Sequence, residues 1–272
     1  MARFTTSDGL SLFYTDEGDG LPILCLAGLT RTTLDFDYVT PHLAGHRLIK
    51  LDYRGRGRSD WDPKWSNYTL PVECRDVLEL LSHLGLDKVA VLGTSRGGLN
   101  AMGLAMAAKH HLLGVALNDV GPVIDPEGIE LIMAFLGRNP SAKTHAQMAA
   151  ALAHVMVGFD DVPDSRWMEE AQKHYTRNED GLQITYDPKL RDAVASGDVA
   201  PDLWPYFDAM EGLPLACLRG ANSNLLSPDT LAEMRRRRPD MIVAELPDRG
   251  HVPFLDEPAA VTALHQWIET MQ

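Results

Sequence analysis

The sequence is poor in cysteine and has no long apolar run. Its 272 residues include only three cysteines, an odd and sparse set, which argues against a disulfide framework and favours a reducing compartment such as the cytoplasm. The longest strongly apolar stretch, GLNAMGLAMAA, is too short to cross a bilayer. The first residues, MARFTTSDG, lack the basic start and apolar region of a signal peptide. These absences predict a cytoplasmic protein that does not enter a membrane.

Positive charge is also scarce, with 25 Lys and Arg against 38 Asp and Glu and a net charge of −13. This balance disfavours binding to nucleic acid or to an anionic membrane surface. No His-x₃-His or Cys-x₂-Cys pair with partners suggests a metal site, and the segment GRGRS lacks the lysine and spacing of a phosphate-binding loop. We therefore expect no metal or cofactor and a small molecule as the partner. The sequence carries no signature of oligomeric state.

What the sequence does contain is a regular alternation of strand-like and helix-like segments. Short continuous apolar runs are typical of strands buried on both faces, and segments with apolar residues at helical spacing separate them. This order predicts an α/β fold with a mostly parallel sheet covered by helices on both faces. Strands are expected within 2–9, 10–18, 22–28, 47–55, 88–93, 112–122, 213–220 and 241–247, and helices within 32–45, 71–86, 97–111, 227–238 and 257–271.

The alternation is interrupted in the middle of the chain. From about Val123 to Leu213 the buried-strand runs disappear, and segments such as PEGIELIMAFLG and THAQMAAALAHVMVG are typical of amphipathic helices. We predict one α/β core, residues 1–122 and 213–272, with a helical lid inserted at residues 123–212. Aromatic and methionine side chains of this lid either line an apolar pocket or, as is commoner, pack the lid onto the core: Met133, Phe135, Met156, Phe159, Trp167, Trp204 and Phe207.

The strongest chemical signal is Gly93-Thr94-Ser95-Arg96-Gly97, a G-x-S-x-G motif between a predicted buried strand and a predicted helix. In that context the serine lies on a sharp, strained turn that exposes its hydroxyl, and the flanking glycines permit close approach of the backbone. The N-terminus of the following helix favours a developing oxyanion. The motif therefore predicts that Ser95 is a nucleophile.

A serine nucleophile needs a base, and position selects one of the ten histidines. His251 follows the last predicted strand, and ligand-facing groups in open α/β sheets lie at the carboxyl ends of strands. A histidine in a surface loop is the alternative interpretation. For the oxyanion, one expected donor is the N–H of Arg96, directly after the nucleophile. The other is the N–H of Leu29, after the third predicted strand, an assignment based on topology and on the resemblance that follows.

Five segments in the order LAGLT, DYRGRGRSD, GTSRGG, LRGANSN and RGHVPFLDEP resemble the α/β-hydrolase family, in its lid-bearing serine esterase and lactonase branch. They span residues 26–258, nearly the whole chain. The resemblance implies Ser95 as nucleophile, His251 as base, and Leu29 and Arg96 as oxyanion donors. Ala27 stands where many members have histidine. Relatives with an aspartate nucleophile are disfavoured because the elbow carries serine.

The resemblance places the acid of the triad at Asn224, where the family usually has aspartate. An amide is neutral and can hold the histidine in the wrong tautomer. Three explanations stay open: Asn224 disables the enzyme, which suits it to trapping a ligand; the acid has moved to Asp119, at the end of another strand; or the protein works without a charged acid or has lost hydrolysis. Asp119 also has a purely structural interpretation, and Asp229 is expected in the first turn of a helix.

The leading functional hypothesis is hydrolysis of a small carboxylic ester or lactone through an acyl-enzyme. The alternatives are a ligand-binding, receptor-like protein with little turnover, suggested by Asn224, and C–C bond hydrolysis or perhydrolase chemistry on the same scaffold.

Overall fold

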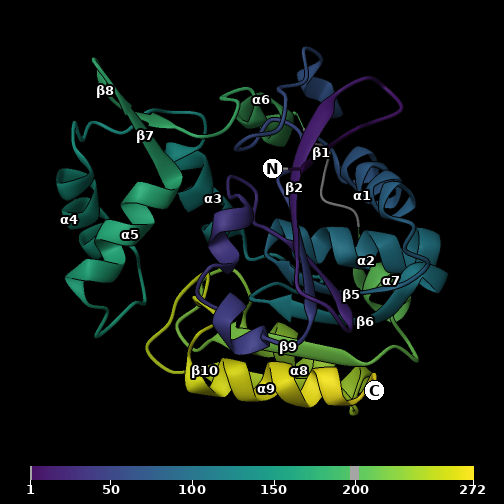
Figure 1. Cartoon of the computed structure of the whole chain (residues 1–272). Coiled ribbons are helices and arrows are strands. Elements are labelled where there is room, and N and C mark those ends of the chain that lie inside the picture. Colours follow the sequence, from purple (N-terminus) through teal and green to yellow (C-terminus); the bar gives the residue numbers. More distant parts are fainter. Residues whose placement is uncertain (1, 197–201) are drawn as a thin grey trace.

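The computed structural model describes residues 2–196 and 202–272, and a sheet of eight strands runs through it (Figure 1). The strands lie in the order β1-β2-β4-β3-β5-β6-β9-β10. β1 and β2 are antiparallel to their neighbours, and all pairs from β4 to β10 are parallel. The strands are β1 Ala2–Thr5, β2 Ser11–Glu17, β3 Pro22–Leu26, β4 Arg47–Leu51, β5 Val89–Thr94, β6 Leu112–Asn118, β9 Leu215–Gly220 and β10 Ile242–Leu246. The predicted α/β architecture is confirmed.

Helices connect the parallel strands, as the crossovers of a parallel sheet require. The α-helices are α1 Leu70–Leu84, α2 Arg96–Ala108, α3 Pro126–Phe135, α4 His145–Val155, α5 Asp164–His174, α6 Leu190–Ala195, α7 Trp204–Asp208, α8 Pro228–Arg237 and α9 Pro258–Glu269. The 3₁₀ helices are η1 Thr33–Phe36, η2 Thr40–Leu43, η3 Trp65–Asn67 and η4 Lys109–His111.

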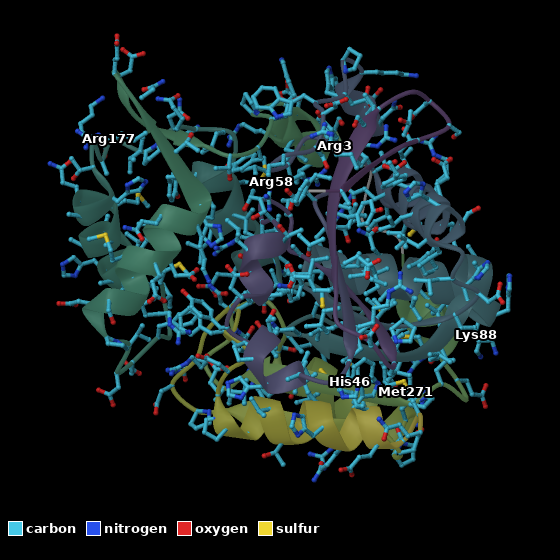
Figure 2. The ribbon with its side chains drawn as sticks, viewed as in Figure 1. Arg3, His46, Arg58, Lys88, Arg177 and Met271 are labelled. Atoms are coloured by element: carbon cyan, nitrogen blue, oxygen red, sulfur yellow. The ribbon has the colours of Figure 1, made fainter. Side chains whose placement is uncertain are left out.

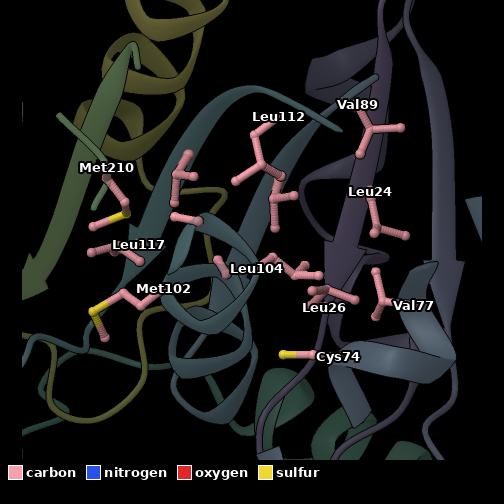
Figure 3. Packing of buried hydrophobic residues seen from close by; sticks show 14 of the residues in the cluster. Leu24, Leu26, Cys74, Val77, Val89, Met102, Leu104, Leu112, Leu117 and Met210 are labelled. Atoms are coloured by element: carbon pink, nitrogen blue, oxygen red, sulfur yellow. The ribbon is translucent and has the colours of Figure 1, made fainter. Parts of the chain in front are cut away.

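Side chains of β3 alternate between two hydrophobic cores, one on each face of the sheet, because successive residues of a strand point to opposite faces. Leu24 and Leu26 belong to the core under α1 and α2. Figure 3 shows them opposite Cys74 and Val77 of α1, with side chains of α2 beside them. Ile23 and Cys25 belong to the other core, which α9 covers. The fully buried strands expected from the sequence therefore result from helices on both faces.

Among its described residues, the segment between β6 and β9 adds no strand to this sheet, and most of it lies to one side of the sheet (Figure 1). Besides helices it contains a two-stranded hairpin, β7 Tyr175–Asn178 and β8 Gly181–Ile184, where the sequence analysis expected only helices. The pair Asp180-Gly181 is a turn signal in the sequence that could have predicted this hairpin, and Gly181 has a φ of 125°. Arg177 of this hairpin and Met271 near the C-terminus lie at opposite ends of the molecule in Figure 2.

The end of this segment packs with the α/β core rather than apart from it. Phe207 of α7 is fully buried in the core that α1 and α2 cover, and its ring contacts that of Trp204 at 5.7 Å between centroids. These two side chains thus pack rather than line a pocket. The boundary at residue 212 stays a prediction.

The helix expected within 32–45 is instead the pair of short 3₁₀ helices η1 and η2. Thr32 caps η1 through its hydroxyl, which accepts a hydrogen bond from Leu34 N–H at 3.4 Å. Pro41 lies in the first turn of η2, where proline is tolerated, but it has no N–H to continue a helix from the preceding turn. Pro41 therefore divides into two short 3₁₀ helices a segment for which the apolar spacing alone predicted one helix.

Candidate active site

The elbow around Ser95 has the geometry that its sequence predicted. All of β5 is buried, and Ser95 follows it with a φ of 49° and a ψ of −113°, directly before α2. A Cβ at Gly97 would lie 1.9 Å from the carbonyl oxygen of Leu26, and a Cβ at Gly93 would lie 2.5 Å from the carbonyl oxygen of Gly97. Both glycines are therefore sterically required, because any side chain would push α2 away from the sheet.

Three side chains meet at the carboxyl ends of the strands. The Oγ of Ser95 lies 3.0 Å from Nε2 of His251, and Nδ1 of His251 lies 2.7 Å from Oδ2 of Asp119. Ser95 follows β5, Asp119 follows β6, and His251 is in the loop after β10. This loop is tied to β6, because the side chain of Asn118 donates a hydrogen bond to the carbonyl of Pro253 at 3.2 Å. Residues from three distant parts of the chain thus form one hydrogen-bonded row.

Asp119 is fully buried, and its carboxylate is held by further donors. Oδ1 accepts a hydrogen bond from Gly220 N–H at 2.9 Å, and Oδ2 accepts one from the Ser223 hydroxyl at 2.7 Å. Asp119 has a φ of 55°, in the left-handed region. A buried carboxylate with three hydrogen-bond partners has a defined orientation. Nothing in the sequence predicts this role of Ser223, because a hydroxyl in a loop gives no pattern that would single it out.

The resemblance implied Asn224 at the position of the triad acid. In the structure, however, the side chain of Asn224 makes no hydrogen bond to His251. Asn224 is half-buried, and its side chain makes no hydrogen bond to any residue of 2–196 or 202–272. The reason is that Asp119 already occupies Nδ1 of the imidazole. Asp229 lies exposed in the first turn of α8, as expected, where Ser227 caps the helix.

The loop after β3 passes beside Ser95. A Cβ at Gly28 would lie 3.9 Å from Cβ of Ser95. Within the described ranges, the backbone N–H groups of Leu29 and Arg96 donate to no other residue. Arg96 is the first residue of α2, so its N–H belongs to the positive end of that helix. That Leu29 and Arg96 donate to an oxyanion stays a prediction, and the lack of an internal acceptor for either N–H is compatible with it.

The inserted segment packs on the loop that carries His251. A Cβ at Gly250 would lie 2.1 Å from the carbonyl oxygen of Val157, and the side chain of Asn222 donates a hydrogen bond to the carbonyl of Gly158 at 3.0 Å. The rings of Phe159 and Trp167 pack against each other and against the ring of Phe254 in this loop, with centroids 5.4 to 6.1 Å apart. These aromatic side chains thus attach the insertion to the core.

Other side chains of the inserted segment differ in their exposure. Met133 and Met156 are partly buried against apolar clusters, whereas Phe135 on α3 is 56% exposed.

The cysteines Cys25, Cys74 and Cys217 are free and buried. In the described part of the chain there is no group of three or more His, Cys, Asp or Glu side chains that could hold a metal ion. No helix there combines the length and the apolar character that a membrane span requires.

The chain is similar to known proteins along most of its length. The model of the alpha/beta hydrolase family matches residues 23–264. The chain is 37% identical over 258 residues to a 3-hydroxybutyrate-oligomer hydrolase of Cupriavidus necator, with 90% of this chain and 87% of that protein covered. It is 25% identical over 244 residues to 2-(acetamidomethylene)succinate hydrolase of Mesorhizobium japonicum, covering 89% and 85%. The crystal structure of an alpha/beta hydrolase from Novosphingobium aromaticivorans matches with a TM-score of 0.92 and 35% identity, covering 98% and 97%.

Proposed function

Because the chain belongs to the alpha/beta hydrolase family, we propose that it is a serine hydrolase that cleaves a small carboxylic ester or lactone through an acyl-enzyme on Ser95. The observation that carries this proposal is the hydrogen-bonded row from Ser95 Oγ to His251 Nε2 and from His251 Nδ1 to Asp119. A nucleophile, a base and a carboxylate that orients the base are the requirements of nucleophilic acyl transfer.

In the first half of the reaction, Ser95 Oγ attacks the carbonyl carbon while its proton moves to His251 Nε2. The Asp119 carboxylate stabilises the imidazolium that forms and keeps the histidine in the tautomer with Nδ1 protonated. The N–H groups of Leu29 and Arg96 bind the oxyanion of the tetrahedral intermediate. When the intermediate collapses, the carbon–oxygen bond breaks and the departing alkoxide takes the proton from His251.

The second half repeats these steps with water. His251 takes a proton from a water molecule as its oxygen attacks the acyl-enzyme carbonyl, and the same two N–H groups bind the new oxyanion. Collapse of this intermediate returns the proton to Ser95 Oγ and releases the carboxylic acid. No metal or redox cofactor takes part in these steps.

The substrate proposal comes from the Cupriavidus necator relative. That protein is named for hydrolysis of 3-hydroxybutyrate oligomers, and it is similar along most of both chains. We therefore propose short linear esters of a 3-hydroxy acid as the substrate class, with the inserted segment at residues 123–212 as the lid over them. The free, buried cysteines support a reducing compartment, the cytoplasm, as the place of action.

The receptor-like alternative depended on the amide at position 224. Asp119 supplies a buried negative charge next to His251, so the neutral side chain of Asn224 leaves the base with a carboxylate partner. This geometry favours turnover over ligand trapping. C–C bond hydrolysis and perhydrolase chemistry use the same three side chains, and a substrate comparison separates them from ester cleavage.

The test is hydrolysis of p-nitrophenyl butyrate and of the linear 3-hydroxybutyrate dimer by the unaltered protein and by Ser95→Ala. We expect both esters to be cleaved and Ser95→Ala to lower kcat by about 10,000-fold or more. A fluorophosphonate should label the unaltered protein at one serine and fail to label Ser95→Ala. Equal hydrolysis by the two proteins, or no hydrolysis of any ester by either, would contradict the proposal.

A further inference from the structure

A buried carboxylate joins two arginine side chains next to the active site. Glu73, in the first turn of α1, is fully buried, and its Oε2 accepts hydrogen bonds from Arg96 Nε at 2.8 Å and from Asn100 Nδ2 at 3.1 Å. Its Oε1 forms an ion pair with Arg56 Nη2 at 2.9 Å. Burial raises the pKa of Glu73, but the charges of the two arginines and these hydrogen bonds outweigh burial and lower the pKa to about 2. The carboxylate is therefore ionised near neutral pH.

Arg56 extends this connection to the loop after β3. It is fully buried, its Nε donates to the carbonyl of Leu29 at 2.9 Å, and its Nη1 donates to the carbonyl of Arg54 at 2.7 Å. Its guanidinium carbon lies 5.6 Å from the ring centroid of Tyr53 and 5.5 Å from that of Tyr68. The group that holds the Leu29 carbonyl is thus itself held from several sides.

Arg96 forms the other end of the connection. Its backbone N–H is one of the two proposed oxyanion donors, and its side chain, 16% exposed, reaches Glu73 from the start of α2. Leu29 supplies the second proposed donor. One carboxylate therefore connects the two residues that carry both donors, through Arg56 on one side and directly on the other.

We propose that Glu73 is a positioning residue that sets the separation and orientation of the two oxyanion donors through Arg56 and Arg96. The inference rests on the proposed function, because the donors matter only if an oxyanion forms. Donors placed before the reaction need no reorganisation when charge develops, which is the main source of their effect. The two arginines and one glutamate also leave a net positive charge beside the site, which favours the anionic transition state.

Stability alone is a weak reason for this arrangement. Replacing a buried ion pair by well-packed apolar side chains is often neutral or stabilising, because desolvation of the charges offsets their attraction. The bridge of Arg96, Glu73 and Arg56, however, ends on the carbonyl of Leu29. Its directional hydrogen bonds define the position of that backbone group in a way that apolar packing does not.

The chain offers a matched control two residues from Arg56 and three from Glu73. Arg54 and Asp76 form a buried pair with contacts of 2.6 and 2.7 Å, in the same loop and on the same helix α1. Among the described residues, the side chain of Arg54 hydrogen-bonds only to Asp8, Asp62 and Asp76, and neither side chain of this pair hydrogen-bonds to a residue that carries a proposed donor. Loss of the control pair tests what a broken buried ion pair does by itself.

The experiment compares Glu73→Gln with Asp76→Asn. Urea unfolding measures the stability of each variant, and assays on p-nitrophenyl butyrate measure kcat and KM under conditions where each is folded. The affinity for a trifluoromethyl ketone with the same acyl chain, which forms an oxyanion on Ser95, is measured against the affinity for butyrate. Arg96→Gln removes the same link at its less buried end and serves if Glu73→Gln does not fold.

We expect Glu73→Gln and Arg96→Gln to lower kcat by about 10- to 100-fold, less than full loss of a donor, with KM within about threefold. The ketone should bind more weakly by a similar factor while butyrate binding is retained. Asp76→Asn should lose stability but keep kcat within about threefold. If the Glu73 and Arg96 variants keep kcat and ketone affinity as Asp76→Asn does, the inference is wrong. Absence of Ser95-dependent turnover in the unaltered protein would instead contradict the proposed function.

Discussion

The neighbouring parallel strands β6 and β9 end side by side, but their ends carry different chemistry. Asn118 and Leu218 pair in register, so the loops that follow start next to each other. The loop after β6 places the buried carboxylate of Asp119 on His251. The loop after β9 places a neutral amide, Asn224, where the family usually has its acid, and a hydroxyl, Ser223, that donates to Asp119.

From this difference we infer that the proposed acid is defined by its position next to Nδ1 of His251 and not by the strand that it follows. In the proposed reaction His251 needs a carboxylate at Nδ1, which here follows β6, whereas the resemblance to the family implies one after the neighbouring strand β9. The end of β9 and its loop still take part in the site, because Gly220, the last residue of β9, and Ser223 in the loop both donate to the Asp119 carboxylate. We infer that the loop has changed from supplying the charge to orienting it.

The largest expected effect comes from removing the charge at the end of β6. We expect Asp119→Asn to lower kcat on p-nitrophenyl butyrate by about 10,000-fold, the scale known for the corresponding change in serine proteases, because the amide favours the wrong tautomer of His251. Steady-state kinetics on the folded variant measures it, with near-ultraviolet circular dichroism as the check on folding. A loss of less than tenfold would show that Asp119 does not serve as the acid.

A second experiment moves the charge from one strand end to the other. In the double variant Asp119→Asn with Asn224→Asp, the only carboxylate of the pair follows β9, so we expect at least about a tenfold recovery of kcat over Asp119→Asn alone. The single Asp119→Asn variant is the matched reference. No recovery would mean that the β9 loop of this chain no longer reaches the imidazole.

A smaller effect is expected from the hydroxyl that supports Asp119. Ser223→Ala removes the donor to Oδ2 and leaves the buried carboxylate with one partner fewer. We expect a loss of about 1 to 2 kcal/mol in the free energy of unfolding and a decrease in kcat of several-fold, because the carboxylate is less well oriented. Urea unfolding and steady-state kinetics measure the two effects. Unchanged kcat together with unchanged stability would contradict the supporting role.

The smallest effect is expected from Asn224→Asp alone. Because Asp119 already binds Nδ1 of His251, a second carboxylate has no vacant partner there, and kcat should change by less than about threefold. The same p-nitrophenyl butyrate assay measures this. An increase by orders of magnitude would reverse the comparison and mark the unaltered chain as an esterase disabled at position 224.

Much of the fold could be predicted, and the failures have local causes. Continuous apolar runs indicate strands that are buried on both faces, so β3, β5, β6 and β9 were all expected. The segment at 32–45 was predicted as one helix because apolar spacing outweighed Pro41. The β7–β8 hairpin was missed although Asp180-Gly181 is a turn signal, because its short strands carry many polar residues.

The elbow at Ser95 and the row that completes it illustrate the division between sequence and tertiary structure. The role proposed for Ser95 could be predicted from about ten neighbouring residues, because the glycines and the strand-to-helix turn are steric requirements within one short segment. The partner of His251 could not be predicted from the sequence. Asp119 lies 132 residues away from it in the chain, and Asn224 in the loop after the neighbouring strand β9 was an equally open candidate. Only the packing of β6, β9 and the His251 loop decides which side chain reaches the imidazole.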